Sequence, residues 1–294
     1  MRAAAILGLG CSERDLAPFQ KDSDANWLIG LPASSGEADV ILIFGGDGTV
    51  HRHLAQLVQL QRPVLVVPRG SGNDFARALG LARIRDSLAA WRKFESASDN
   101  VRSIDLGTIT ELTAGEALAP HRQYFCCVGG VGLDGEVSRR ANNLPRWLRG
   151  HGGYIFSFPP ALIKFAPFPM TILEPQPEGS DNFVTRNSGP AVVGTFANTP
   201  LYGGGMKIAP KALLDDGLLD ICVVKDINKF KLFCLFPTIY FGRHTGMREV
   251  EYFQSSRLRI ETERPFDVYA DGEYVCQTPV EVGVARAALQ VIVP

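Results

Sequence analysis

The sequence has little of what marks a membrane-spanning, nucleic-acid-binding or zinc-stabilised protein. No stretch reaches the roughly 18 apolar residues of a transmembrane helix, because prolines interrupt the two most apolar segments, 154–170 and 232–241. The 30 basic and 31 acidic residues leave a net charge of −1, so no global field attracts nucleic acid. We therefore expect no transmembrane segment and no nucleic-acid partner.

Cysteine is sparse and shows no metal-binding pattern. The six cysteines include no Cys-x-x-Cys pair, and the five histidines form no zinc-binding helix motif, which argues against a structural zinc site. Cys126 and Cys127 lie in a strand-like segment, where neighbouring side chains point to opposite faces. Residues 1–10 lack the basic lead of a signal peptide. These features predict buried, reduced thiols and a cytoplasmic location.

The most informative segment is a glycine turn made of Gly45, Gly46, Asp47, Gly48 and Thr49. The apolar run 41–44 before it predicts a buried parallel strand, and residues 50–60 have helical spacing. Backbone N–H groups in such a strand–turn–helix segment bind anionic oxygens. The carboxylate of Asp47 then predicts Mg²⁺ bridging to phosphate, with a tight turn and a solvated Asp as the alternative. No Gly-Lys dipeptide occurs, which excludes a P-loop.

A second glycine turn repeats this arrangement. Gly70, Ser71, Gly72 and Asn73 follow the apolar run 63–67 and precede a helix from about Asp74. Two such turns at the carboxyl ends of neighbouring parallel strands form the usual crevice for a nucleotide. Ser71 can donate to a phosphate oxygen, whereas Asn73 and Asp74 either cap the helix or serve the site.

The pattern of the chain changes near residue 102. Before it, alternating strand and helix patterns predict an α/β domain with a parallel sheet flanked by helices over 1–102, rejoined by the last strand, about 285–294. After it, short alternating runs predict a mostly antiparallel β-sandwich over 103–284. The runs are 124–128, 191–197, 219–224, 257–261 and 266–270. Residues 133–165 have helical spacing, and 178–190 are expected to form a polar loop.

Taken together, the motifs resemble the diacylglycerol kinase catalytic-domain family, most closely its soluble bacterial lipid kinases, which are relatives of the sphingosine kinases. The resemblance covers nearly the whole chain and rests on five segments in order: 45–49, 70–76, 105–107, 203–220 and 271–273. The third glycine-rich segment, 202–210 with 215–220, is the most family-specific. The resemblance implies a fold like NAD kinase and phosphofructokinase, with the active site in the cleft between the domains.

The resemblance also implies an activity and the residues that perform it. The activity is Mg²⁺-dependent transfer of the ATP γ-phosphate to a hydroxyl of diacylglycerol or a related lipid, as in phospholipid biosynthesis. Asp47, Asp74 and Asp105 would hold Mg²⁺ and water around the transferring phosphate. Asp271 would accept the proton of the lipid hydroxyl, with Glu273 as the competing base. From the residues alone, Asp271-Gly272 between two strands is a hairpin turn.

Two further features concern the metal and the nucleotide. The resemblance implies a structural Mg²⁺ held by the Asp216 carboxylate and the main-chain oxygens of Leu213 and Leu218, where a simple turn is the alternative. The chain departs from the family at Gly8–Cys11, where relatives usually carry an Asn-Pro turn that helps to enclose the nucleotide. This departure leaves nucleotide affinity and base selectivity open.

Residues 139–170 interleave basic and aromatic side chains, which predicts transient peripheral contact with a membrane surface that supplies the lipid substrate. The alternative is core packing of these aromatics. The residues are Arg139, Arg140, Arg146, Trp147, Arg149, Tyr154, Phe156, Phe158, Phe165 and Phe168. Two other functions stay open: an NAD kinase, which shares the first turn, and a non-catalytic nucleotide or lipid sensor. The sequence is compatible with a homodimer and does not identify the lipid.

Overall fold

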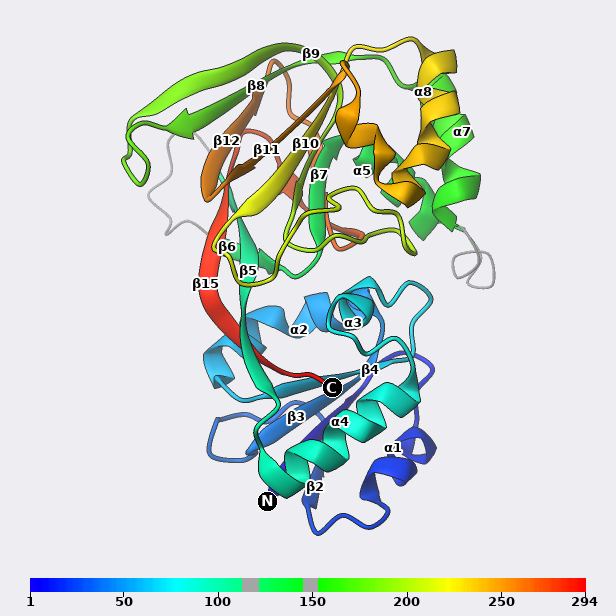
Figure 1. Ribbon diagram of the computed structural model, residues 1–294, viewed down its shortest axis with the longest axis vertical. Coiled ribbons are helices and arrows are strands. Elements are labelled where there is room, and N and C mark those ends of the chain that lie inside the picture. The colour runs from blue at the N-terminus through cyan, green and yellow to red at the C-terminus, as the bar shows by residue number, and fades with distance from the viewer. Residues whose placement is uncertain (113–121, 145–152) are drawn as a thin grey trace. The chain divides into compact units, whose positions relative to one another are not determined.

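The structure is a computed structural model that describes residues 1–112, 122–144 and 153–294 (Figure 1). The chain forms two compact units, a first unit of residues 1–106 with 286–294 and a second unit of residues 107–285. Strands β5 (Val101–Glu111) and β15 (Val280–Ile292) each contribute residues to both units. Within the described ranges, every helix is too short or too polar to cross a bilayer.

The first unit is an α/β domain around a parallel sheet, as predicted. Its strands are β1 (Arg2–Leu7), β2 (Asn26–Ile29), β3 (Val40–Gly45) and β4 (Val64–Pro68), in the order β4-β3-β1-β2. Strand β15 joins β4 in parallel, with Val291 opposite Val64. The helices are α1 (Glu13–Gln20), α2 (Asp47–Leu60), α3 (Asp74–Ala78) and α4 (Ile84–Ala97). Figure 1 shows α2 with α3 on one face of the sheet and α1 with α4 on the other.

Strands β3 and β4 are buried along their whole length. Parallel strands covered by helices on both faces need such continuous apolar runs, which is why the sequence predicted them well. Helix α2 begins at Asp47, three residues before the predicted start. Gly48 and Thr49 therefore lie in the first helical turn and place the helix N-terminus directly at the glycine turn.

The second unit is built mainly of antiparallel strands, as expected for a β-sandwich. The strands are β6 (Arg122–Phe125), β7 (Val128–Gly132), β8 (Phe168–Pro175), β9 (Phe183–Ala197), β10 (Leu219–Lys225), β11 (Val250–Ser255), β12 (Arg257–Thr262), β13 (Asp267–Ala270) and β14 (Glu273–Gln277). Strand β9 pairs with β8 along its first part and with β7 and β10 along its last part. Strand β9 therefore links β8 with β7 and β10.

Helical segments cover part of these strands. They are α5 (Leu133–Asn142), α7 (Gly153–Lys164), α8 (Lys229–Leu235) and the 3₁₀ segments η1 (Phe236–Phe241) and η2 (Arg243–Gly246). Helix α7 contacts both α5 and α8 (Figure 1). Of the helical spacing predicted over 133–165, α5 and α7 confirm 133–142 and 153–164, whereas residues 145–152 lie outside the described residues.

Two local predictions were wrong. The polar segment 178–190 is not entirely a loop, because β9 begins at Phe183 and hydrogen-bonds to β8. The first half of β9 is partly exposed, so its sequence does not need to alternate apolar and polar residues. The segment 124–128 is not one strand either, because the chain bends at Cys126 and Cys127 between β6 and β7.

The bend overturns the expected orientation of the two neighbouring thiols. Their sulfur atoms lie 3.9 Å apart instead of on opposite faces of a strand. Neither takes part in a disulfide. The prediction of burial holds for Cys126, Cys127, Cys222 and Cys276, whereas Cys11 is half-buried and Cys234 exposed.

Candidate active site

The two glycine turns of the first unit touch each other through their backbones. A β-carbon on Gly70 would lie 2.3 Å from the Cα of Gly46, and one on Gly46 would lie 2.8 Å from the Cα of Gly70. The N–H of Arg69 donates to the carbonyl of Gly45 at 2.9 Å. Only glycine allows this approach, so both turns expose main chain at the carboxyl ends of β3 and β4.

The first turn leads directly into α2. Gly46 is the N-cap residue, and its carbonyl accepts from the N–H groups of Thr49 and Val50. The Thr49 side chain fills the space beside Gly45 and Gly8, where added β-carbons would lie 2.5 and 2.7 Å from its hydroxyl oxygen. The first N–H groups of a helix have no acceptor within the helix, so a helix N-terminus favours anionic oxygens.

The unusual end of β1 is closed by backbone hydrogen bonds. The N–H of Gly8 donates to the Phe44 carbonyl at 2.7 Å, and the N–H of Cys11 donates to the Gly8 carbonyl at 3.0 Å. Nearby, Arg69 of the second turn forms an ion pair with Asp15 of α1. A turn without Asn-Pro is therefore fixed by glycine, because a larger residue at position 8 would collide with Thr49.

Asp47 ties the first turn to the second. Its carboxylate accepts the N–H of Asp74 at 3.1 Å and the N–H of Phe75 at 3.0 Å. Sequence reasoning assigned Asp47 to a cation and missed this capping of α3, because its partners lie 27 and 28 residues away. A carboxylate oxygen has two lone pairs, so one N–H bond does not prevent it from binding a cation or its water.

Asn73 shapes the second turn. It has a left-handed backbone with φ of 56°, which asparagine tolerates better than most residues. Its side-chain oxygen accepts the N–H of Gly70 at 2.8 Å, and its amide donates to the carbonyl of Gly70 at 2.7 Å. These bonds keep Ser71 and Gly72 at the tip of the turn. Ser71 is exposed and Gly72 half-buried.

Asp74 and Asp105 are both buried in the first unit, at 3% and 5% exposure. The Asp74 carboxylate accepts from the Arg77 guanidinium at 3.0 Å. It lies beside the second turn, since a β-carbon on Gly72 would be 3.7 Å from its Oδ2. Asp105 accepts the N–H of Ala287, a residue with φ of 48°, at 2.7 Å. This hydrogen bond of Asp105 therefore holds β15 where that strand returns to the first unit.

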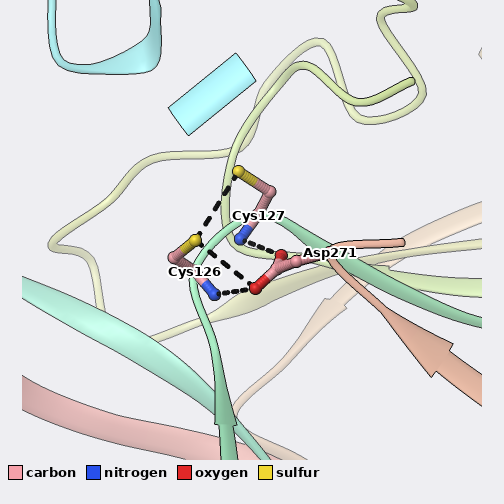
Figure 2. A group of neighbouring side chains, drawn as sticks. All are labelled: Cys126, Cys127 and Asp271. Carbon is pink, nitrogen blue, oxygen red and sulfur yellow. Dashed lines mark hydrogen bonds between the residues drawn. The ribbon is translucent and has the colours of Figure 1, made fainter. Parts of the chain in front are cut away.

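Asp271 occupies a two-residue hairpin turn in the second unit. Asp271 and Gly272 have φ values of 51° and 84°, as a type I′ turn between β13 and β14 requires. The turn is docked, because the N–H of Asp271 donates to the Val128 carbonyl at 2.9 Å. Its carboxylate accepts the N–H of Cys126 at 2.9 Å and that of Cys127 at 2.8 Å (Figure 2). The hairpin expected from the residues thus carries a carboxylate held in one orientation.

Glu273 is placed differently from its neighbour. It begins β14, is half-buried and pairs with Ala270 across the hairpin. A strand residue projects from one face of its sheet. The two candidate bases are therefore distinguishable by their anchoring.

Asp216 forms a local turn with a second carboxylate beside it. Its Oδ1 accepts the N–H of Leu218 at 3.0 Å. The amide of Gln254 lies 3.5 Å from Asp216 Oδ2 and 3.2 Å from Asp220 Oδ2. Burial raises the pKa of Asp220, and the charge of Asp216 raises it further. The side-chain amide of Gln254 therefore bridges the two carboxylates as a hydrogen-bond donor. Sequence reasoning did not assign Asp220 or Gln254 to this group.

An apolar pocket lies in the second unit, between α5, α7, α8 and the strands β9 and β10. Its polar lining consists of Asp134, Thr195, Tyr202 and His244. The apolar lining consists of Leu133, Val137, Phe158, Val193, Met206, Ile208, Val224, Leu232, Leu235, Phe236, Ile239 and Val250. A mostly apolar pocket with a few polar groups is the usual form of a site for an apolar ligand.

Asp134 makes this pocket sensitive to pH. Burial raises the pKa of its carboxyl to about 6, against the opposing effect of a hydrogen bond from Tyr202. Because this pKa exceeds the ordinary value of 3.8, the folded state binds the proton more tightly than the unfolded state. The stabilisation is present below pH 4 and lost as pH rises through 6.

We expect Asp134→Asn to remove this dependence. Asn keeps an acceptor for Tyr202 and carries no charge. The free energy of unfolding of the variant, relative to that of wild type, should therefore rise by about 3 kcal/mol from pH 4 to pH 7. Denaturant unfolding at several pH values measures the difference. The exposed Asp24→Asn is the matched control, compared with wild type over the same pH range. A flat difference for Asp134→Asn would contradict the assignment.

Comparison with known proteins places the chain in a family. Residues 11–109 match the diacylglycerol kinase catalytic domain, and residues 128–293 match the YegS C-terminal NAD kinase beta sandwich-like domain. A protein of Mycobacterium tuberculosis named diacylglycerol kinase is 33% identical over 271 residues, which cover 92% of this chain and 82% of the relative.

Solved structures share the fold. A diacylglycerol kinase structure from Bacillus anthracis aligns over 100% of this chain and 96% of its own, with a TM-score of 0.68 and 20% identity. An NAD kinase from Archaeoglobus fulgidus, in complex with ATP, aligns over 99% and 93% with a TM-score of 0.54 and 12% identity. These two likenesses concern the fold alone. From the two family domains and the 33% identical relative, we conclude that the chain belongs to the diacylglycerol kinase catalytic-domain family of lipid kinases.

Proposed function

We propose that this protein transfers the γ-phosphate of ATP, with Mg²⁺, to a hydroxyl of diacylglycerol or a closely related lipid in phospholipid metabolism. The observation that carries the proposal is the 33% identity, over 92% of the chain, to a protein named diacylglycerol kinase. The apolar pocket of the second unit supports a lipid acceptor over NAD. The shared fold with an NAD kinase bound to ATP supports ATP as the donor.

In this proposal residues 1–102 with 285–294 bind the nucleotide, and residues 103–284 bind the lipid. Backbone N–H groups of the two touching turns and the N-terminus of α2 hold the phosphates. Asp47 and Asp74 lie beside these turns and have the oxygen donors that Mg²⁺ prefers. Asp105 would be the third carboxylate of this group. Bound Mg²⁺ neutralises the charge on the phosphate oxygens.

Asp271 is the proposed general base. Its carboxylate accepts two backbone N–H bonds, which fix its direction. It would receive the proton of the acceptor hydroxyl, a role that Glu273 would take if Asp271 serves only the hairpin. The Asp216 carboxylate, with the main-chain oxygens of Leu213 and Leu218, would hold a structural Mg²⁺, and the crowded carboxylates there support it.

We further propose that α7, α8 and η1 contact the membrane surface transiently while the protein remains cytoplasmic. Lys229 of α8 donates to the Ile163 carbonyl of α7 at 2.6 Å, so these elements adjoin. Their exposed apolar side chains are Phe156 at 58%, Ile163 at 72%, Phe230 at 77%, Phe233 at 52% and Phe241 at 73% exposure. Amphipathic surfaces with interleaved lysines bind the headgroup layer.

Of the aromatic side chains predicted to form a membrane surface over 139–170, some are exposed and others are buried. Phe156 is exposed, whereas Phe158 is buried and stacks on Phe236 with ring centroids 3.9 Å apart. Phe168 is also buried in the core. Arg146, Trp147 and Arg149 lie outside the described residues, as does the side chain of Tyr154.

Liposome co-sedimentation tests the membrane surface. We expect Phe230→Ser with Phe241→Ser to lower the partition coefficient by roughly tenfold per residue, because each ring loses about 1.5 kcal/mol of apolar transfer. Leu9→Ser is a control of equal exposure, 73%, in the first unit. Equal sedimentation of the double variant and wild type would contradict the proposal.

The activity itself is tested with labelled ATP, Mg²⁺ and the total lipid extract of the organism, followed by identification of the labelled product. A labelled lipid supports the proposal and names the acceptor. Labelling of NAD under the same conditions would favour an NAD kinase. Binding of ATP without any labelled product would favour a nucleotide or lipid sensor.

A further inference from the structure

Two thiols lie directly beside Asp271 in the second unit. The sulfur of Cys126 is 3.9 Å from the sulfur of Cys127 and 3.4 Å from Asp271 Oδ2 (Figure 2). One ligand atom from each of the three residues lies within 4.8 Å of the other two. In the part of the chain that the structure describes, no other group of three His, Cys, Asp or Glu side chains converges in this way.

Two of these three separations match the spacing of ligands around a tetrahedral metal ion. Zinc binds thiolate sulfur at about 2.3 Å and carboxylate oxygen at about 2.1 Å, so two bound sulfurs lie roughly 3.8 Å apart and a sulfur–oxygen pair roughly 3.6 Å apart. The observed separations of 3.9 and 3.4 Å differ from these by tenths of an ångström. We propose that Cys126, Cys127 and Asp271 form a site for a thiophilic divalent cation of the Zn²⁺ class.

The backbone holds the ligands in this arrangement. The N–H groups of Cys126 and Cys127 donate to the Asp271 carboxylate. Their carbonyls accept from Asn198, at 3.2 Å from its side-chain amide and at 2.8 Å from its N–H. Asn198 is fully buried. Hydrogen bonds that orient metal ligands are a regular part of metal sites, because they reduce the rearrangement on binding.

The chemistry of the donors selects the metal. Each thiol releases its proton when it binds the cation, so binding strengthens as pH rises. Two sulfur donors disfavour Mg²⁺, which takes oxygen ligands, and favour Zn²⁺ or Cd²⁺. Three protein ligands leave a fourth position open for water or an exogenous oxygen. Asp271 is half-buried, whereas both cysteines are buried, so the cation would enter past the carboxylate.

Occupation of this site would engage the carboxylate of Asp271. The cation binding stands on the three side chains and their spacing alone. Its effect on turnover rests on the proposed function, in which Asp271 accepts the proton of the lipid hydroxyl. If that role holds, Zn²⁺ at micromolar concentration inhibits the kinase, and a chelator restores it.

The test uses the full chain with reduced thiols and Cd²⁺ as a spectroscopic probe. We expect one equivalent of Cd²⁺ to produce a thiolate-to-metal charge-transfer band that Zn²⁺ displaces and Mg²⁺ does not. Cys126→Ser and Cys127→Ser should each weaken Cd²⁺ binding by about 10²-fold or more. Cys234→Ser, which removes the exposed thiol of α8, is the matched control and should leave the band unchanged.

A second measurement needs no substitution. Alkylation of Cys126 and Cys127 in wild type, followed by mass spectrometry, should slow at least tenfold with one equivalent of Cd²⁺, while Cys234 reacts at the same rate. Absence of the band and of this protection would overturn the site, whatever the kinase assay shows. A band and protection without inhibition by Zn²⁺ would establish the site and contradict the role of Asp271 in turnover.

Discussion

Asp271→Asn is expected to lower the kcat of lipid phosphorylation by about 10²- to 10⁴-fold, the usual contribution of a general base. Asn keeps one oxygen for a backbone N–H but presents an amide group to the other, since Cys126 and Cys127 each donate to one carboxylate oxygen. The mismatch should also cost about 1–3 kcal/mol of stability. Asn tolerates the left-handed backbone at this position, where φ is 51°. Steady-state kinetics with the identified lipid, together with thermal unfolding, measures both effects.

Glu273→Gln is the matched control for this substitution. It removes the charge of the neighbouring candidate, which is half-buried at the start of β14. We expect a much smaller loss of kcat than for Asp271→Asn. A rate near wild type for Asp271→Asn would remove Asp271 from the base role, and a large loss confined to Glu273→Gln would assign that role to Glu273.

Gly70→Ala is expected to abolish tight ATP binding. The new β-carbon would lie 2.3 Å from the Cα of Gly46 and 2.9 Å from its nitrogen, so one of the two turns must move. Backbone atoms cannot rotate away as a flexible side chain can. A displacement of about 1 Å in a positioning element weakens function by about 10²-fold, and overpacking of this kind costs about 1–3 kcal/mol. Equilibrium ATP titration and denaturant unfolding measure the two losses.

Gly36→Ala controls for the loss of a glycine in the same unit. A β-carbon on Gly36 would meet its nearest neighbour, the Ser34 hydroxyl, at an ordinary 3.7 Å. We expect its stability to stay within about 0.5 kcal/mol of wild type, with unchanged ATP affinity. If Gly70→Ala binds ATP as tightly as this control, direct contact of the two turns is not needed for the nucleotide.

The first glycine turn shows how far local patterns reach. A continuous apolar run, a glycine-rich segment and helical spacing predict β3, the turn and α2 in order, because each depends on neighbouring residues. The predicted start of α2 is three residues too late, because the glycines around Asp47 obscure the helical pattern. The role of Asp47 as a cap for α3 was missed, because nothing in the pattern around residue 47 points to the N–H groups of Asp74 and Phe75.

The second unit shows where local patterns end. The hairpin at Asp271-Gly272 follows from two residues that favour positive φ. The bend at Cys126 and Cys127 does not follow from its own sequence, which reads as a strand. It is stabilised by a carboxylate about 145 residues away in the chain, which accepts N–H groups that a continuous strand would direct to opposite sides.

Local patterns in the amino-acid sequence predict most of the strands and helices, the order of the motifs and, through their resemblance, the lipid kinase family. Apolar periodicity, glycine spacing and turn residues are local properties, and they are readable without coordinates. Tertiary packing sets the backbone contact of Gly46 with Gly70, the N–H groups that Asp47 and Asp271 bind, and the convergence of two neighbouring thiols on a carboxylate. These contacts join residues distant in the chain, and their geometry is set by packing of the whole unit.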